Sequence, residues 1–214
     1  MMTETVTLFR PVGLREMQLI LEADRKAFPP RLPEQPYFYP VLNVEYANQI
    51  ARDWNTKNPQ SGFAGYVTTF KVDKDYINQF EEHVVGAAIH RELWIPAEQL
   101  EVFNQHILEP IELIGAFYGD GYKGIKHYFP DRYVKEIFET FYVLFIHDLG
   151  QDLSAEITLN RNAILLNFKY WITHDFSDTV LYEGEQERFL KHLAEVWQMK
   201  FPEIKLLGVE LLEK

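Results

Sequence analysis

The first 120 residues contain short stretches in which apolar and polar side chains alternate, the pattern of strands with one buried face. This alternation predicts strands at residues 5–10, 37–39, 64–72, 84–95 and 110–118. Between them, apolar residues recur at every third or fourth position and predict helices that begin near Gly13, Asn43, Asp73 and Pro96. Strands and short helices in this irregular order, without regular βαβ units, indicate an α+β domain.

A proline-dense stretch, residues 29–36, separates the first predicted helix from the second strand. Proline fixes its own φ and has no amide hydrogen, so this stretch cannot form regular structure. Its stiff backbone is consistent either with a loop held in one conformation or with a plain surface connector.

A second pattern follows a glycine-containing segment near residue 120. We interpret residues 1–120 as the first domain, 121–130 as a linker and 131–214 as a small accessory domain of unknown role. Helices are predicted from Asp131 and over residues 185–199, and strands at 153–159, 163–173 and 204–212. The expected order of the second domain is therefore α-β-β-α-β.

Composition narrows the classes of function. Asp and Glu number 32 against 21 Lys and Arg, a formal net charge of −11. General binding to nucleic-acid backbones requires clustered basic residues, so it is not expected, whereas a basic protein partner would suit the charge. The sequence shows no apolar leader and no apolar stretch of about 20 residues, so we expect a cytoplasmic protein without a membrane segment.

Metal chemistry finds no support in the sequence. The chain has no cysteine, which excludes disulfides, thiol nucleophiles and Cys-ligated zinc. His90 and Glu92 match the H-x-E half of the zinc deaminases, but the P-C-x-x-C half of that motif cannot exist here. The seven histidines show no H-E-x-x-H spacing. We therefore expect no metal site.

Three residues of the first domain are candidates for binding or catalysis. Arg10 ends the first predicted strand on its apolar face, where it would form a structural ion pair or meet an anion. Tyr39 ends the second strand and is either a core residue or a stacking surface for a flat ligand. Glu92 shares a predicted strand face with His90 and Trp94. A carboxylate there is either a surface group or a functional one, because burying it unpaired is costly.

Five stretches carry a resemblance to a group of small bacterial proteins of the ADP-ribosylation/crystallin type. They read Leu8-Phe9-Arg10-Pro11-Val12-Gly13, Ala27-Phe28-Pro29-Pro30-Arg31-Leu32-Pro33, Phe38-Tyr39-Pro40-Val41-Leu42-Asn43, Gln49-Ile50-Ala51-Arg52-Asp53-Trp54-Asn55 and His90-Arg91-Glu92-Leu93-Trp94-Ile95-Pro96-Ala97-Glu98. More distantly, residues 8–118 resemble the ADP-ribosyltransferase fold. The resemblance implies a split-sheet N-terminal domain and does not cover residues 125–214.

The resemblance also implies roles for individual residues. NAD would be the substrate, with Arg10 on its phosphates or ribose and Tyr39 stacked on the nicotinamide. Glu92 would bind the 2′-hydroxyl of the nicotinamide ribose and stabilise the oxocarbenium-like transition state, and His90 would help to select or activate the acceptor. The sequence departs from the family because it lacks a Ser-Thr-Ser strand and the usual Gln or Glu at position 90. The alternative is a non-enzymatic interaction or immunity-like protein on a degenerate version of this fold.

Overall fold

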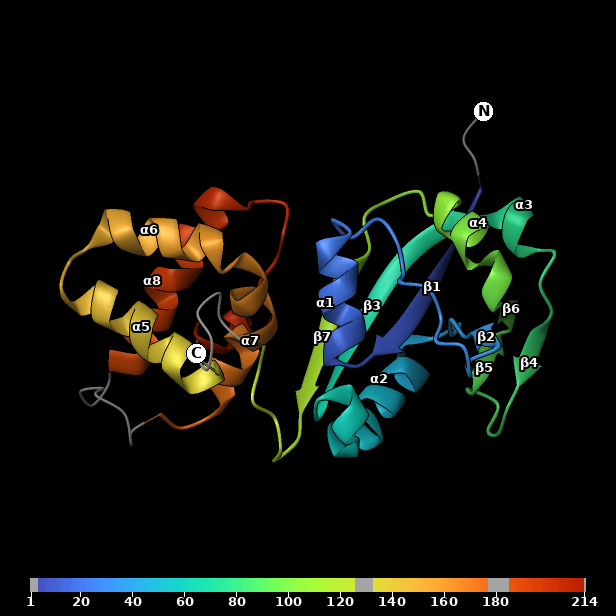
Figure 1. The fold of residues 1–214 in the computed structure, drawn as a ribbon, viewed down its shortest axis with the longest axis horizontal. Helices are drawn as coiled ribbons and strands as arrows, with labels where there is room; N and C mark the ends of the chain where they lie inside the picture. Colours follow the sequence, from blue (N-terminus) through green and yellow to red (C-terminus); the bar gives the residue numbers. More distant parts are fainter. Residues whose placement is uncertain (1–3, 126–132, 177–184, 214) are drawn as a thin grey trace. The chain divides into compact units, whose positions relative to one another are not determined.

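The computed structural model describes residues 4–125, 133–176 and 185–213 (Figure 1). The chain divides into two compact units, Met1–Tyr122 and Lys123–Lys214. This boundary falls inside the segment 121–130 that the sequence analysis interprets as a linker, of which residues 126–130 lie outside the described residues. The chain mixes helices with small sheets, consistent with α+β. Within the described ranges, every helix is too short or too polar to cross a membrane.

An antiparallel three-stranded sheet of order β1-β3-β7 forms the centre of the N-terminal unit (Figure 1). Its strands are β1 (Thr5–Val12), β3 (Ala64–Asp73) and β7 (Glu112–Tyr118). The register pairs Leu8 with Phe70 and Arg10 with Thr68, and all four face the same side of the sheet. Arg10 therefore lies on a core face, as its alternation with Leu8 predicts.

Four shorter strands form two further two-stranded pairings: β2 (Tyr37–Phe38), β4 (Glu82–Val84), β5 (Arg91–Leu93) and β6 (Ile95–Pro96). β2 pairs with β6, and β4 with β5. Val41 forms antiparallel bridges with both Phe9 and Glu92, so the segment around it joins the β4–β5 hairpin to β1. The single strand expected at 84–95 is wrong. The chain instead reverses direction through a loop at 85–90, where a Cβ on Gly86 would lie 2.6 Å from the His90 ring.

Helices cover both faces of the sheet. They are α1 (Leu14–Glu22), α2 (Val44–Asp53), α3 (Lys74–Ile77) and α4 (Leu100–Gln105). The Oδ1 atom of Asn43 accepts the Tyr46 amide hydrogen at 2.8 Å, which confirms Asn43 as the N-cap of α2. α2 packs closely on β3, because a Cβ on Gly65 would lie 2.1 Å from the Ala51 carbonyl oxygen.

Among the described residues of the C-terminal unit, all regular elements are helices, so the expected α-β-β-α-β order is wrong. Its helices are α5 (Val134–Ile146), α6 (Gly150–Leu159), α7 (Arg161–Thr173) and α8 (Glu185–Lys200), followed by the short 3₁₀ turn η4 (Val209–Leu211). Segments 153–159 and 163–173 are helices, and 204–212 contains turns and η4 in place of a strand.

The error has a physical cause. In α7 the consecutive residues from Ala163 to Phe168 are all buried, so the apolar run carries no clear period of either 2 or 3.6. Such a run fits a buried strand or a buried helix, and its length of 13 residues favours the helix. Helical spacing is visible in α6, where the buried residues Leu153 and Ile157 are four apart and Leu159, next in the alternation, is exposed.

Candidate functional site

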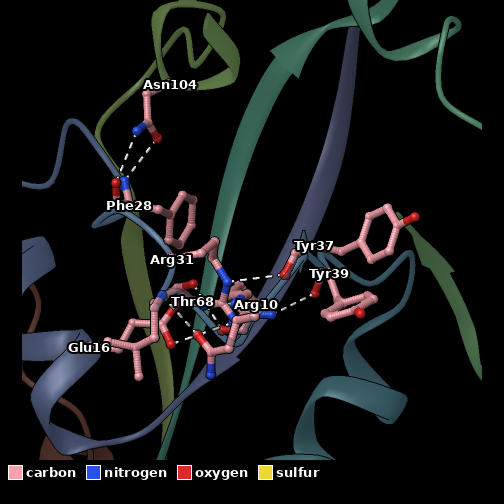
Figure 2. A network of polar contacts seen from close by, with 10 residues as sticks. Arg10, Glu16, Phe28, Arg31, Tyr37, Tyr39, Thr68 and Asn104 are labelled. Carbon is pink, nitrogen blue, oxygen red and sulfur yellow. Dashed lines mark hydrogen bonds and ion pairs between the residues drawn. The ribbon is translucent and has the colours of Figure 1, made fainter. Parts of the chain in front are cut away.

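Arg10 is buried inside a network of polar contacts (Figure 2). Its Nε donates to Glu16 Oε1 at 3.2 Å, and its Nη1 donates to the Tyr39 carbonyl oxygen at 2.9 Å. Its Cζ lies 4.8 Å from the centroid of the Phe38 ring, a cation–π contact. The sequence left open a structural ion pair or an anion ligand for this residue, and the structure shows the ion pair. The guanidinium also fixes the backbone that carries Tyr39.

Tyr39 belongs to an aromatic cluster, by which we mean Tyr37, Tyr39, His83 and Trp94. Ring centroids lie 6.0 Å apart for Tyr39 and Trp94 and 5.7 Å apart for Tyr37 and Trp94. The His83 ring stacks on the Trp94 indole with centroids 4.2 Å apart. Trp94 remains 37% exposed, so the cluster reaches solvent. The Tyr39 ring is thus neither isolated nor fully buried, and it contributes to an accessible aromatic surface.

Glu92 is the charged group beside this cluster. Its Oε1 accepts a hydrogen bond from the Trp94 indole nitrogen at 2.7 Å. Glu92 is paired across the hairpin with His83, and its backbone bridges to Val41. The side chain is half-buried. Burial raises the pKa of the Tyr46 phenol, and the negative charge of Glu92 raises it further. The structure therefore holds the carboxylate by the indole and places the Tyr46 phenol within reach of its charge.

His90 contacts α2 and not the aromatic cluster. Its ring stacks on Tyr46 with centroids 4.4 Å apart, and its Nε2 lies 3.0 Å from Gln49 Oε1. The amide of Ala87 donates to His90 Nδ1 at 3.2 Å. Because Nδ1 accepts, Nε2 carries the proton and donates to Gln49. Both ring nitrogens are occupied, so the ring anchors the 85–90 loop to α2.

The structure brings Arg10, Tyr39 and Glu92 into one region, but they do not all contact one another through their side chains. Tyr39 and Glu92 both contact Trp94, whereas Arg10 reaches Tyr39 only through its carbonyl group. The sequence pattern places Trp94 on the face of Glu92 but indicates no role for it. His83 was missed, because its position opposite Glu92 depends on the unpredicted hairpin.

The arrangement suits one kind of ligand chemistry. A carboxylate accepts hydrogen bonds from hydroxyl or ammonium groups and attracts positive charge, and aromatic faces attract cations and stack on flat rings. Among the described residues, no group of three or more His, Asp or Glu side chains converges in a way that could hold a metal ion. A flat, positively charged ring that carries hydroxyl groups would satisfy the aromatic cluster and Glu92 together.

Comparisons with family models, with curated proteins and with solved structures return no match for this chain.

Proposed function

We propose that the N-terminal unit is an NAD-using enzyme of the ADP-ribosyltransferase type, which cleaves the bond between nicotinamide and ribose. The observation that supports it best is the 2.7 Å hydrogen bond from the Trp94 indole to Glu92, within an aromatic cluster that includes Tyr39. This contact leaves the second carboxylate oxygen of Glu92 able to accept from a ligand. The same arrangement puts ring faces beside a negative charge.

The nicotinamide end of NAD matches these two features. Its pyridinium ring is flat and positively charged, so it is attracted to the faces of Tyr39 and Trp94. The ribose 2′-hydroxyl would donate to Glu92. As the bond breaks, positive charge develops on the ribose ring, and a fixed carboxylate stabilises that charge more than it stabilises the ground state.

The reaction balances without a further reactant except the acceptor. The bond between C1′ and the pyridinium nitrogen breaks, and its electron pair neutralises the ring to give nicotinamide. The lone pair of an acceptor oxygen or nitrogen then forms a bond to C1′, and the acceptor's proton passes to solvent. His90 is a positioning residue in this scheme, because its two nitrogens are bonded to Ala87 and Gln49.

Arg10 also has a positioning role in this proposal. Its guanidinium is about nine-tenths buried and bonded to Glu16 and Tyr39, so it does not extend to the phosphates of a ligand on the aromatic cluster. It instead fixes the strand on which Tyr39 is presented. The phosphate role that the resemblance implies for Arg10 is therefore not part of the proposal.

Nicotinamide release from NAD by the purified full chain tests the proposal. Glu92→Gln keeps the size of the side chain and removes its charge, so turnover should fall by roughly 10²–10³-fold with little change in melting temperature. The exposed Glu101 on α4 offers a matched control, and Glu101→Gln should keep wild-type turnover. A wild-type chain that neither binds NAD nor releases nicotinamide would refute the proposal.

A second candidate is a non-enzymatic interaction protein, and the β4–β5 hairpin favours it. Val84, Val85 and Ile89 are 59%, 42% and 47% exposed on this one hairpin, so an apolar surface lies beside the site. Together with the net charge of −11 it would suit a basic partner with an apolar contact. A defined basic partner that binds wild type but not Ile89→Ser, in a protein inert to NAD, would support this function instead.

A further inference from the structure

Two buried guanidinium groups share a single carboxylate in the N-terminal unit (Figure 2). Glu16 Oε1 lies 3.2 Å from Arg10 Nε and 3.8 Å from Arg31 Nη1. The side chains of Arg10 and Arg31 are only 10% and 9% exposed. Two positive charges and one negative charge leave a surplus of one positive charge, which is costly to keep away from water.

Arg31 is the less satisfied of the two arginines. Its Nε donates to the Tyr37 carbonyl oxygen at 3.1 Å. Among the described residues its two NH₂ groups make no hydrogen bond, and the ion pair to Glu16 at 3.8 Å is too long for one. Burial lowers the pKa of the Arg31 guanidinium, and the Arg10 charge lowers it further, while Glu16 raises it. Arginine still stays protonated at neutral pH.

Arg31 lines a cavity of about 310 Å³. The proline-dense stretch contributes Pro29, Pro30 and Arg31 to this lining. Residues at the start of α1, Glu16 among them, and the polar residues Asn58, Gln60 and Ser61 complete the lining. The volume exceeds that of one small ion and would accept an ion together with part of the molecule that carries it.

The N-terminus of α1 adds a second source of positive potential. Gly13 has no side chain to cap the helix, and the first α1 amide bonded to a backbone acceptor is that of Met17. The earlier amides and the helix dipole favour an anion at this end. Gly13 also allows a close approach, because a Cβ there would lie 2.8 Å from the Ser61 Cα. The helix end and the Ser61 side of the cavity are therefore adjacent.

We infer that this cavity binds a phosphoryl group, held by the free NH₂ groups of Arg31 with the start of α1 and the Ser61 hydroxyl. The planar guanidinium fork matches two phosphate oxygens, and an anion cancels the surplus charge of the Arg10–Glu16–Arg31 group. The inference does not depend on the proposed NAD activity, because it concerns residues other than Glu92 and the aromatic cluster and a ligand that needs no turnover.

Binding of inorganic phosphate and pyrophosphate to the purified full chain tests the inference by calorimetry and thermal shift, against chloride at equal ionic strength. Wild type should bind, and Arg31→Gln should weaken binding by at least about tenfold, as expected when charge-assisted hydrogen bonds are lost. Arg52→Gln is the matched control, since it removes one exposed arginine that pairs with Asp53. Its affinity should stay at the wild-type value.

A second variant covers the case in which Arg31→Gln fails to fold. Ser61→Asp places a carboxylate in the cavity while keeping Arg31, so it should abolish the phosphate response without the loss of a core contact. A wild-type response no larger than that of chloride would overturn the inference. So would an unchanged affinity in a folded Arg31→Gln or Ser61→Asp variant.

Competition identifies the source of the phosphoryl group. If ADP-ribose displaces phosphate, and Arg31→Gln weakens both, the group belongs to the diphosphate of a nucleotide. If phosphate and ADP-ribose bind together, the cavity serves a separate phosphate ester. Glu92→Gln should bind phosphate as wild type does, so a failure of NAD turnover and a failure of phosphate binding are separable.

Discussion

Glu16→Gln removes the one negative charge that Arg10 and Arg31 share, and its effect on stability can be estimated from the structure. Removing one partner of a buried ion pair costs about 3–5 kcal/mol. The Glu16 side chain is 21% exposed, so water screens part of the interaction and lowers the expected cost by about 1 kcal/mol. The amide retains one weak acceptor for Arg10. We expect the free energy of unfolding of the N-terminal unit to fall by about 2–4 kcal/mol.

The assay must resolve the N-terminal unit from the C-terminal one, because two units need not unfold together. Hydrogen exchange of peptides from β1 and β3, followed through a urea titration, reports on the sheet that carries Arg10. With a urea m-value of about 2 kcal/mol/M, the midpoint of these peptides should fall by about 1–2 M. Peptides from α7 contain no member of the network and serve as an internal reference.

Two results would refute this reasoning. A loss below about 1 kcal/mol would mean that the guanidinium groups are solvated well enough to need no partner. The second result concerns an Arg10→Met, Arg31→Met background, in which both positive charges are absent. If Glu16→Ala lowers the stability of that background by the expected amount, the loss comes from packing and not from charge. Phosphate should restore part of the stability of Glu16→Gln, since the vacated charge enlarges the positive surplus.

Three further predictions concern the N-terminal unit. Gly65→Val should destabilise it by more than about 3 kcal/mol in urea unfolding, because backbone at Ala51 blocks the added Cβ; wild-type stability would contradict the packing of α2 on β3. Asn43→Ala should cost about 1 kcal/mol in thermal unfolding through loss of the α2 cap, and Asn43→Asp should recover most of it. The Arg91 guanidinium lowers the pKa of Glu82, so this pair stabilises the hairpin above the unfolded pKa of about 4.5 and ceases to do so as pH falls through the folded value. The protection of the β4–β5 amides, meaning their exchange relative to the intrinsic rate at each pH, should fall on acidification in wild type, and less in Arg91→Gln. An equal fall in both would exclude the pair as the cause.

Local patterns predicted the elements of the N-terminal unit well. The alternation around Leu8, the cap at Asn43 and the apolar stripe of α1 each involve residues close in the chain, and their physics is local. The hairpin was not predictable in this way. Its two strands have three residues each, and the loop between them is rich in apolar residues, so periodicity alone reads them as one strand.

The candidate site also combines features that are local in the sequence with features that depend on tertiary contacts. Glu92 and Trp94 are two apart on the chain, so their shared side of the strand is visible in the sequence. Glu16 forms ion pairs with both Arg10 and Arg31. This arrangement depends on how the proline-dense stretch folds back over α1. The spacing of residues along the chain does not predict this tertiary contact. A charged residue on an apolar face was identifiable, but its partner was not.

The double bridge of Val41 has a consequence for how this chain can vary. Because one residue pairs with both Phe9 and Glu92, the distance along the chain between β2 and the start of α2 sets the register of the carboxylate against β1. Inserting or deleting a single residue at 40–42 would shift one of these two pairings by one residue and break the present link between β1 and the β4–β5 hairpin. Changes of length after Tyr122, where the chain leaves the N-terminal unit, carry no such coupling. Natural or engineered variation in length should therefore concentrate there, and the Pro40–Leu42 segment should keep its length wherever the Glu92 chemistry is kept.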